Sequence, residues 1–208
     1  MGGGGSSYDE NSYIQDGLVF QLDGINKGSN QGYWTDLKGG CTFSIPVSGV
    51  DVLEKGFEFD GNSFMKLSSG TIPNDVSYTV EASVVLIKDP GRVGVFCARI
   101  GSNSGDIAIV ISGDTSVFMQ RQNTVKNAYT INRLAIFSYN TNVCCVNGSQ
   151  GVFNTSDYWG TRNIGMGSLG GALNNFIGII HSIRIYNRQL SLAEMQFNQD
   201  IDLKRFGT

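Results

Sequence analysis

Residues 176–198 constrain the fold of this chain more than any other segment. The first half of the segment alternates in polarity, because Ile183 and Ile185 fall on one side of an extended chain while Arg184 falls on the other. This pattern is typical of a long strand that is half buried. We expect the strand to end at Tyr186, where a polar stretch follows.

The period changes after that strand. Ser191 lies three residues before Glu194, a spacing that predicts a capping box, in which each side chain bonds the backbone amide of the other residue. Leu190 and Met195 stand at the positions of a hydrophobic staple. The sequence therefore predicts a short helix over residues 191–199.

Short apolar runs recur along the rest of the chain, and clusters of Gly, Asn, Asp and Ser separate them. Runs of this length with turn residues between them predict an antiparallel sandwich or jelly roll. The pair Asn147 and Gly148 favours a tight hairpin, since both residue types adopt positive φ readily. The candidate strands cover residues 18–22, 57–59, 64–67, 78–87, 93–100, 107–111, 117–121, 134–139, 143–146 and 177–186.

The length of 208 residues suits one sandwich domain with a sizeable core. The start of the chain differs from the rest, because residues 2–5 are all glycine and no apolar period follows them. We expect a flexible Gly-rich arm over residues 1–14 and one folded domain over residues 15–208. Myristoylation at Gly2 is the less favoured explanation of this start.

The charge balance excludes one class of partner. The chain has 15 Lys and Arg against 18 Asp and Glu, a net charge of −3, and it has no basic stripe that would displace the counterions of a nucleic acid. No apolar run is long enough to cross a bilayer, and the N-terminus lacks the features of a secretory signal. We therefore expect synthesis in the cytoplasm, no nucleic-acid binding and no membrane insertion.

The four cysteines do not have the spacing of a metal site. Cys144 and Cys145 are adjacent on an expected strand, so their side chains point to opposite faces and do not form a natural disulfide. We interpret these two, together with Cys41 and Cys97, as small buried hydrophobic residues.

Seven motifs follow one another along the chain: GLVFQLD at residues 17–23, WTDLKG at 34–39, FEFDG at 57–61, SYTVE at 77–81, VCCVNG at 143–148, NIG at 163–165 and the closing segment at 176–198. In this order they resemble the concanavalin A-like lectin/glucanase superfamily, and within it the laminin-G-like domains of the non-catalytic type. The closing segment is the most specific of the seven. The resemblance covers residues 15–200 and implies an all-β fold, an antiparallel two-sheet jelly-roll sandwich with one short C-terminal helix.

Members of this broad fold often bind calcium through carboxylate and carbonyl oxygens. Where the closing signature usually has Asp, this chain has His181, its one histidine, so an inherited calcium site is doubtful and we expect no metal and no cofactor. A histidine alone on a strand is more often structural. Asp36 and Asp60 are alternative oxygen ligands, but turn hydrogen bonds explain both residues better.

We expect no catalytic residues. Glycoside hydrolases of this sandwich fold need two carboxylates about 5–9 Å apart across the scissile bond. Glu58 and Asp60 share a face of an expected strand, but Asp60 precedes Gly61 and has the position of a turn residue. Residues 165–170 match a dinucleotide-binding Gly-x-Gly-x-x-Gly pattern, yet no helix is expected after them.

Sugar-binding sites combine an aromatic platform for the apolar face of a ring with polar groups for its hydroxyls. Such groups concentrate in loops on a rigid scaffold. The alternative for the two tryptophans is that they fill the ends of the sandwich, and for Arg121 that it belongs to a solvated sheet edge. The candidate ligand-binding residues are Tyr33, Trp34, Arg121, Tyr158, Trp159 and Arg162.

The sequence thus predicts a lectin-like recognition module without catalytic activity, which binds glycans or another cell-surface polymer in adhesion. The alternative is a structural or decoration subunit of a virion or fibre that binds no sugar, because a Gly-rich arm without an export signal suits a phage particle. The two hypotheses are compatible, with the module on a virion surface. A glycoside hydrolase is the third and least favoured hypothesis.

Overall fold

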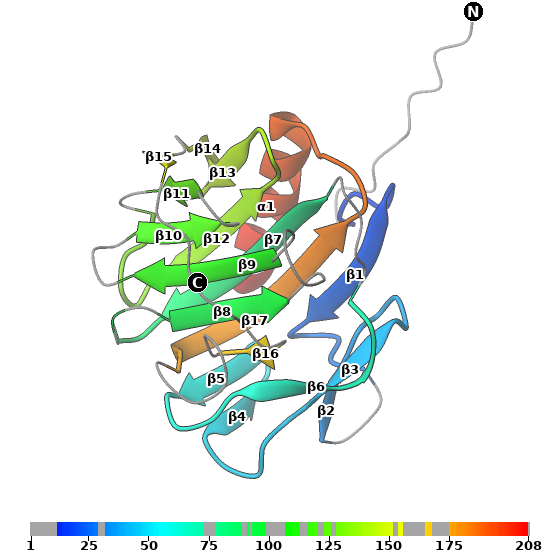
Figure 1. Cartoon of the computed structure of the whole chain (residues 1–208), viewed down its shortest axis with the longest axis vertical. Helices are drawn as coiled ribbons and strands as arrows, with labels where there is room; N and C mark the ends of the chain where they lie inside the picture. The colour runs from blue at the N-terminus through cyan, green and yellow to red at the C-terminus, as the bar shows by residue number, and fades with distance from the viewer. Residues whose placement is uncertain are drawn as a thin grey trace, which may run out of the picture.

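The computed structural model describes residues 12–28, 32–72, 78–88, 91, 93–98, 107–112, 116–119, 123–125, 128–151, 154–155, 165–167 and 175–207. Within these residues the chain forms two stacked sheets with one helix packed on the outside (Figure 1). Every strand pair described is antiparallel. The expected all-β sandwich with a C-terminal helix is confirmed.

The first sheet, sheet A, has the order β14-β13-β12-β7-β17-β5-β4, and β1 also pairs with β17. Its strands are β1 (Leu18–Asp23), β4 (Val50–Leu53), β5 (Gly56–Asp60), β7 (Thr79–Leu86), β12 (Leu134–Tyr139), β13 (Cys144–Val146), β14 (Ser149–Gln150) and β17 (Ile177–Tyr186).

The second sheet, sheet B, has the order β15-β11-β10-β9-β8-β16-β6-β3-β2. Its strands are β2 (Tyr33–Thr35), β3 (Cys41–Ser44), β6 (Met65–Gly70), β8 (Val93–Ala98), β9 (Ile107–Ser112), β10 (Ser116–Met119), β11 (Asn123–Val125), β15 (Asn154–Thr155) and β16 (Gly165–Met166).

The hydrophobic core lies between the sheets, because each strand turns alternate side chains inward. Three phenylalanine rings show how the sheets meet: Phe20 from β1 packs against Phe43 from β3 and Phe96 from β8. The ring centroids are 6.4 Å apart for Phe20 and Phe43, 5.9 Å for Phe20 and Phe96, and 6.5 Å for Phe43 and Phe96. These separations are those of attractive aromatic pairs, so the contact holds the two sheets together.

Long strands were predicted better than short ones. The predicted strands over residues 134–139 and 177–186 have the bounds of β12 and β17, and the others overlap β1, β5, β6, β7, β8, β9, β10 and β13 with shifted ends. The sequence prediction missed β2, β3, β4, β11, β14, β15 and β16, which have two to four residues each. Strands this short hold too few residues to show a period of two.

The predicted hairpin at Asn147 and Gly148 is confirmed. These residues have φ of 49° and 80°, and Val146 pairs with Ser149 across the turn. Positive φ at both central positions defines the type I′ turn, whose twist matches that of the strands it joins.

The helix α1 (Leu192–Phe206) begins as predicted and ends later. The Ser191 hydroxyl accepts from the Glu194 amide at 3.3 Å, and the Ser191 amide donates to the Glu194 carboxylate at 2.8 Å, so the capping box is confirmed. The helix continues past the expected end at residue 199, because Asp202 and Phe206 are buried against the sandwich. No helix in the described ranges is long and apolar enough to span a membrane.

α1 packs on the outer face of sheet A, on the side away from sheet B (Figure 1). The segment before β1 packs beside it, since Tyr13 and Ile14 are only 5% and 2% exposed. These two residues were expected in the flexible arm, but their apolar surface is covered by the domain. The folded part of the chain therefore begins before residue 15.

The described cysteine side chains fit the sequence interpretation. Cys41, Cys144 and Cys145 are free and buried. Cys144 belongs to the core between the sheets, whereas Cys145 packs with α1 on the outer face of sheet A. Burial raises the pKa of Cys144 and Cys145 to about 11, so both thiols stay protonated and unreactive at neutral pH. The side chain of Cys97 lies outside the described residues.

Candidate functional site

A row of three side chains crosses the outer face of sheet B at its β2 edge. Directly paired residues of neighbouring strands share one face of a sheet. Tyr33 of β2 pairs with Ser44 of β3, and Ser44 pairs with Lys66 of β6. Tyr33 is 40% exposed, Ser44 is half-buried, and Lys66 is exposed. We call these three residues the Tyr33 row.

A second aromatic ring lies beside the Tyr33 row. Phe64 precedes Lys66 by two positions, and the Lys66 Nζ lies 5.1 Å from the centre of the Phe64 ring. Phe64 is half-buried, while Met65 between the two residues is fully buried in the core. A cation–π contact of this kind keeps the ammonium group close to the ring. The Tyr33 row and Phe64 together therefore offer two aromatic rings and one ammonium donor.

Two further hydroxyls stand on the same face of the sheet. Thr42 is two positions from Ser44 on β3 and pairs with Ser69 of β6, and the two side-chain oxygens are 2.8 Å apart. Rings stack on the apolar faces of small molecules, and hydroxyl and ammonium groups donate to oxygens. Chemically, this surface suits a flat, hydroxyl-rich ligand.

Sequence analysis found Tyr33 but missed Phe64, Lys66 and Ser44. The alternation in residues 64–67, in which Phe64 and Lys66 take turns with the apolar Met65 and Leu67, was the available signal for two of them. The pairing of Ser44 with both other strands was not readable, because it depends on the register of three strands.

The prediction for Trp34 as a ligand platform is wrong. Trp34 is fully buried, its ring centroid lies 4.4 Å from that of Phe57, and its indole Nε1 donates to the Asp23 carbonyl at 3.1 Å. Because Tyr33 and Trp34 are neighbours on one strand, they point to opposite faces. Trp34 therefore fills the core, as the packing alternative for this residue held.

Four candidate residues lie outside the described part of the chain: Arg121, Tyr158, Trp159 and Arg162. The strands that flank them are placed. β11 pairs with β15 through Asn123 and Thr155. The four residues themselves stay predictions of the sequence analysis.

Tyr33 lies far from β11 and β15 along sheet B. It belongs to β2 at one edge of the sheet, whereas β11 and β15 are at the other edge. Seven strand-to-strand steps lead from β2 to β11, a path of roughly 30 Å at about 4.8 Å per step. The next strand along the chain, β16, pairs through Gly165 with Lys66 of the Tyr33 row, so the described strands do not separate the other candidates from Tyr33.

The aspartates considered as metal ligands make turn hydrogen bonds. Asp36 is buried, and its carboxylate accepts from the turn amides of Lys38 at 3.0 Å and Gly40 at 2.9 Å. Asp60 accepts from the backbone and side-chain nitrogens of Asn62 at 2.7 and 2.9 Å, and these bonds lower its pKa. The turn interpretation is confirmed for both, and no group of three metal-binding side chains occurs in the described ranges.

His181 has a packing role. It is 7% exposed, its ring stacks on that of Phe206 with centroids 4.9 Å apart, and its Nδ1 lies 2.5 Å from the Lys55 carbonyl oxygen. Burial lowers the pKa of His181, so the ring is neutral at pH 7. A neutral ring stacked under the end of α1 helps to dock the helix.

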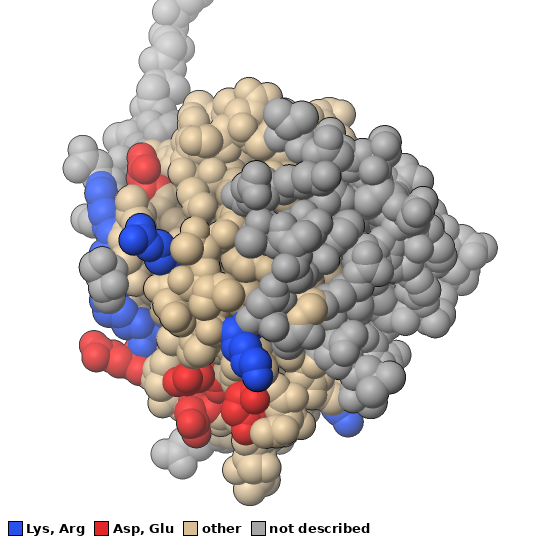
Figure 2. All heavy atoms as spheres, turned by 90° about the vertical axis from the view of Figure 1, so that its left-hand side faces the viewer, with Lys and Arg blue, Asp and Glu red and all other residues tan. Residues whose placement is uncertain are grey.

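Acidic side chains gather on the outer side of β4 and β5. Asp51 and Glu58 are directly opposite each other, and Asp60 follows on the same face of β5. Figure 2 shows acidic side chains together at the lower end of that view, where these strands lie in Figure 1. Like charges opposite each other repel, so this surface disfavours anions.

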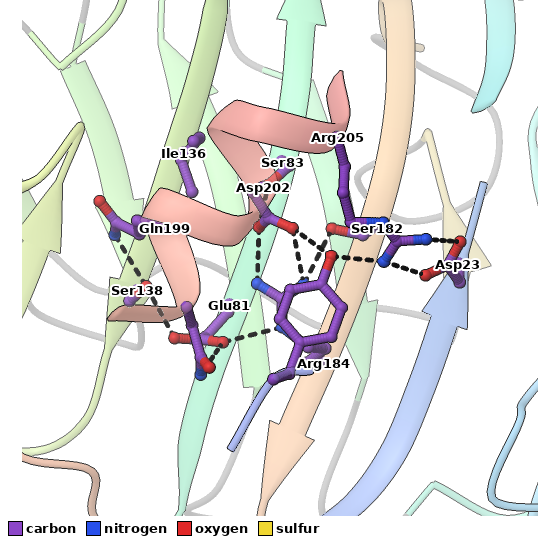
Figure 3. Close-up of polar contacts among 12 residues, drawn as sticks. Asp23, Glu81, Ser83, Ile136, Ser138, Ser182, Arg184, Gln199, Asp202 and Arg205 are labelled. Atoms are coloured by element: carbon purple, nitrogen blue, oxygen red, sulfur yellow. Dashed lines mark hydrogen bonds and ion pairs between the residues drawn. The ribbon is translucent and has the colours of Figure 1, made fainter. Parts of the chain in front are cut away.

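A different polar cluster lies under α1, on the outer face of sheet A. Arg184 of β17 donates from Nε to Glu81 of β7 at 2.9 Å, and from both terminal nitrogens to Asp202 of α1 at 2.9 and 2.6 Å (Figure 3). All three side chains are completely buried. Burial raises the pKa of Glu81, and Arg184 acts against this shift. We call this group the Arg184 cluster.

Other α1 side chains complete the Arg184 cluster. Asn198 donates to Glu81 at 2.9 Å, and Gln199 donates to the Ser138 hydroxyl at 2.8 Å. Ser83 donates to the second oxygen of Asp202. Because these groups bond one another and have no exposed surface, the cluster fastens the helix to the sheet and is closed to a ligand.

No protein-family model matches the sequence, and no curated protein is similar to it in sequence. Solved structures are similar in fold. A Trypanosoma rangeli sialidase in complex with sialic acid matches with a TM-score of 0.62 and 13% identity, over 92% of this chain and 34% of that chain. The chain therefore spans about a third of the sialidase.

Two isolated domains match over most of their length. Domain 4 of AbnA, a GH43 extracellular arabinanase from Geobacillus stearothermophilus in complex with arabinotriose, has a TM-score of 0.58 and 15% identity, with coverage of 88% of this chain and 97% of that one. The CBM40 domain of a Ruminococcus gnavus sialidase bound to α2,3-sialyllactose has a TM-score of 0.52 and 14% identity, with coverage of 68% and 95%. At this identity the matches show the fold alone: a β-sandwich shared with carbohydrate-binding domains.

Proposed function

We propose that this chain is a lectin-like module of the laminin-G-like type that binds glycans without hydrolysing them, and that the sugar lies on the Tyr33 row. The observation that carries the proposal is the row itself. Tyr33, Ser44 and Lys66 place an exposed ring, a hydroxyl and an ammonium group side by side on a rigid sheet. Fold neighbours with bound saccharides support the proposal by analogy.

A second group of contact residues is proposed from the sequence alone. Arg121, Tyr158, Trp159 and Arg162 combine aromatic and cationic groups of the kinds that stack on sugar rings and donate to their oxygens. Contacts beyond the Tyr33 row would suit a long glycan or a surface polymer better than a single sugar, because an extended chain can use several contacts at once.

The proposal includes no hydrolysis. A glycosidase needs a general acid whose pKa is raised above its ordinary value, together with a second, ionised carboxylate. Of the two carboxylates considered, Glu58 and Asp60, the second accepts hydrogen bonds from Asn62 that lower its pKa, so it does not suit the acid role. We expect no turnover on a polysaccharide panel, either by the wild type or by Asp60→Ala.

An experiment with neutral and acidic glycans can determine which class of glycan binds. One neighbouring structure holds neutral arabinotriose and another holds acidic sialyllactose. Lys66 would add a charge-assisted hydrogen bond to a sugar carboxylate. An array with neutral and acidic glycans, screened with and without calcium, separates the two classes and tests the calcium expectation.

The row is tested by Tyr33→Ala and Lys66→Ala, and the second group by Trp159→Ala. Loss of one stacking ring is expected to weaken binding by about two- to tenfold, from about 0.5–1.5 kcal/mol of aromatic contact. The matched control is Lys204→Ala, because Lys204 is an exposed lysine on α1, away from sheet B.

Each result has a clear meaning. Sugar-competable binding that falls in the Tyr33 and Lys66 variants, and stays unchanged in the Lys204 variant, supports the proposal. Binding that only Trp159→Ala removes moves the site from the Tyr33 row to the segment that holds Trp159. Absence of binding to every glycan rejects the recognition role and favours the alternative of a structural subunit in a virion or fibre.

A further inference from the structure

The first described residues of the chain are attached to α1 by side-chain contacts. The Tyr13 hydroxyl donates to Asp202 at 2.6 Å and accepts from Arg205 at 2.7 Å. The Ile14 amide donates to the Asn198 side chain at 2.9 Å. All three partners belong to α1, so residues 12–16, which we call the N-terminal strap, and the helix hold each other in place.

The strap also closes the Arg184 cluster. The Tyr13 ring lies flat against the guanidinium group of Arg184, with Cζ 3.8 Å from the ring centre. Asp202, which Arg184 binds with two hydrogen bonds, takes a further one from Tyr13. Without that ring, water would reach a guanidinium and a carboxylate that are now completely buried, and charges that are hydrated lose less when they separate.

Arg205 extends these contacts to β1. Its guanidinium binds the Asp23 carboxylate with two hydrogen bonds of 2.6 and 2.9 Å (Figure 3), and the same group reaches Tyr13. Tyr13 is thus bonded to two oppositely charged side chains of the last turns of α1, Asp202 and Arg205. Burial raises the pKa of Tyr13 far above its ordinary value, so the hydroxyl remains a donor at any working pH.

The strap forms no strand pair in the structure that is described. Its chain turns into β1 through a hydrogen bond from the Leu18 amide to the Gln15 carbonyl at 3.1 Å. Gly17 has φ of 76° at this turn, and a Cβ there would lie 2.9 Å from Arg188. Arg188 also bonds Asp16 of the strap, at 3.1 Å to its carbonyl and 2.9 Å to its carboxylate. Lifting the strap would therefore break such side-chain contacts but no described strand pairing.

We infer that the N-terminal strap is a latch for α1. When the strap is bound to the helix, it covers the Arg184 cluster and holds the last turns of α1 in place. When the strap detaches, the cluster becomes accessible to water and the last turns of α1 loosen. Any partner or force that pulls on the chain before Ser12 would then loosen the helix on the outer face of sheet A. This device is independent of glycan binding on sheet B.

Hydrogen–deuterium exchange of the full-length chain tests the latch. Tyr13→Ala removes both the ring and the hydroxyl, while Tyr13→Phe keeps the ring over Arg184 and removes the hydroxyl alone. We expect exchange of the α1 amides over residues 198–206 to rise about tenfold in Tyr13→Ala, the scale of one lost charge-assisted hydrogen bond. Tyr13→Phe should give a smaller rise at the same amides.

The matched control is Tyr33→Ala, which removes an exposed tyrosine on sheet B and should leave α1 exchange unchanged. Unchanged α1 exchange in Tyr13→Ala would overturn the latch, and so would an equal rise in α1, β7 and β17, which would mean general destabilisation. If Tyr13→Ala does not fold, Tyr13→Phe decides: a rise confined to α1 supports the latch, and no rise overturns it.

Discussion

The two outer faces of the sandwich differ in the burial of their polar side chains. On sheet A, the polar residues Glu81, Ser83 and Arg184 are completely buried under α1 and bonded to its side chains. On sheet B, the polar residues of the Tyr33 row carry no described helix above them, and Tyr33 and Lys66 reach the surface. Both sheets turn alternate side chains outward. On sheet A these side chains attach α1, and on sheet B those of the Tyr33 row remain at least partly exposed to solvent.

This difference in exposure indicates which face of the fold can bind a ligand. A buried ionic group is costly to open, because each charge would lose its partner inside the protein. An exposed ring with neighbouring donors is already hydrated and needs no rearrangement to accept a sugar. Stability and recognition should therefore respond separately to substitutions on the two faces.

The largest expected effect is that of Arg184→Ala. It removes the guanidinium between Glu81 and Asp202 and leaves two buried carboxylates without it, so we expect a loss close to the upper end of about 3–5 kcal/mol in the free energy of unfolding. Urea denaturation measures it. Lys66→Ala on the exposed face should stay within about 0.5 kcal/mol of the wild type. Similar losses of free energy of unfolding in both variants would contradict the difference between the two faces.

The next effect compares two neighbours on β2. Trp34→Ala empties a core position and should cost about 3–5 kcal/mol, whereas Tyr33→Ala should cost under about 1 kcal/mol. Glycan affinity should show the reverse order once both proteins are confirmed as folded by circular dichroism. A folded Trp34→Ala protein that loses binding while Tyr33→Ala keeps it would reassign the row.

Much of the fold could be predicted from the sequence because it depends on residues close together in the chain. The capping box at Ser191 and Glu194 and the turn at Asn147 and Gly148 depend on residues next to each other, and β17 is long enough to show its period. The missed strands, at the edges and inside sheet B, have only two to four residues each, which is too few to show a period of two.

The parts that could not be predicted depend on pairing across the fold. Arg184 lies opposite Glu81 in the sheet and 18 residues before Asp202 in the chain, and only that meeting explains why a charged residue in α1 is buried and why the helix extends to Phe206. In the same way, the sequence indicated Tyr33 by its residue type. Lys66 lies near Tyr33 only because of the register of β2, β3 and β6, so the sequence did not reveal it as part of the candidate site.

The smallest expected effect lies at the rim of the covered face, where Glu194 caps α1 and is bonded by Arg188 at 2.7 Å. The bonds from Arg188 and Ser191 lower the pKa of Glu194 from 4.5 to about 2. A lowered pKa means that the ionised carboxylate stabilises the fold above about pH 4.5 and that this stabilisation is lost as the pH falls towards 2. Because both side chains are partly exposed to solvent, we expect only about 1 kcal/mol.

Glu194→Gln measures that contribution, because glutamine preserves the capping box and removes the charge. Urea midpoints at several pH values between 2 and 7 should show the variant less stable at pH 7 and equal to the wild type near pH 2. Asp200→Asn, on the exposed side of the same helix, is the control and should follow the wild-type curve. A pH-independent difference for Glu194→Gln would mean that the ion pair at the rim contributes nothing. The charges that hold α1 would then be those of the sealed Arg184 cluster, where solvent cannot screen them.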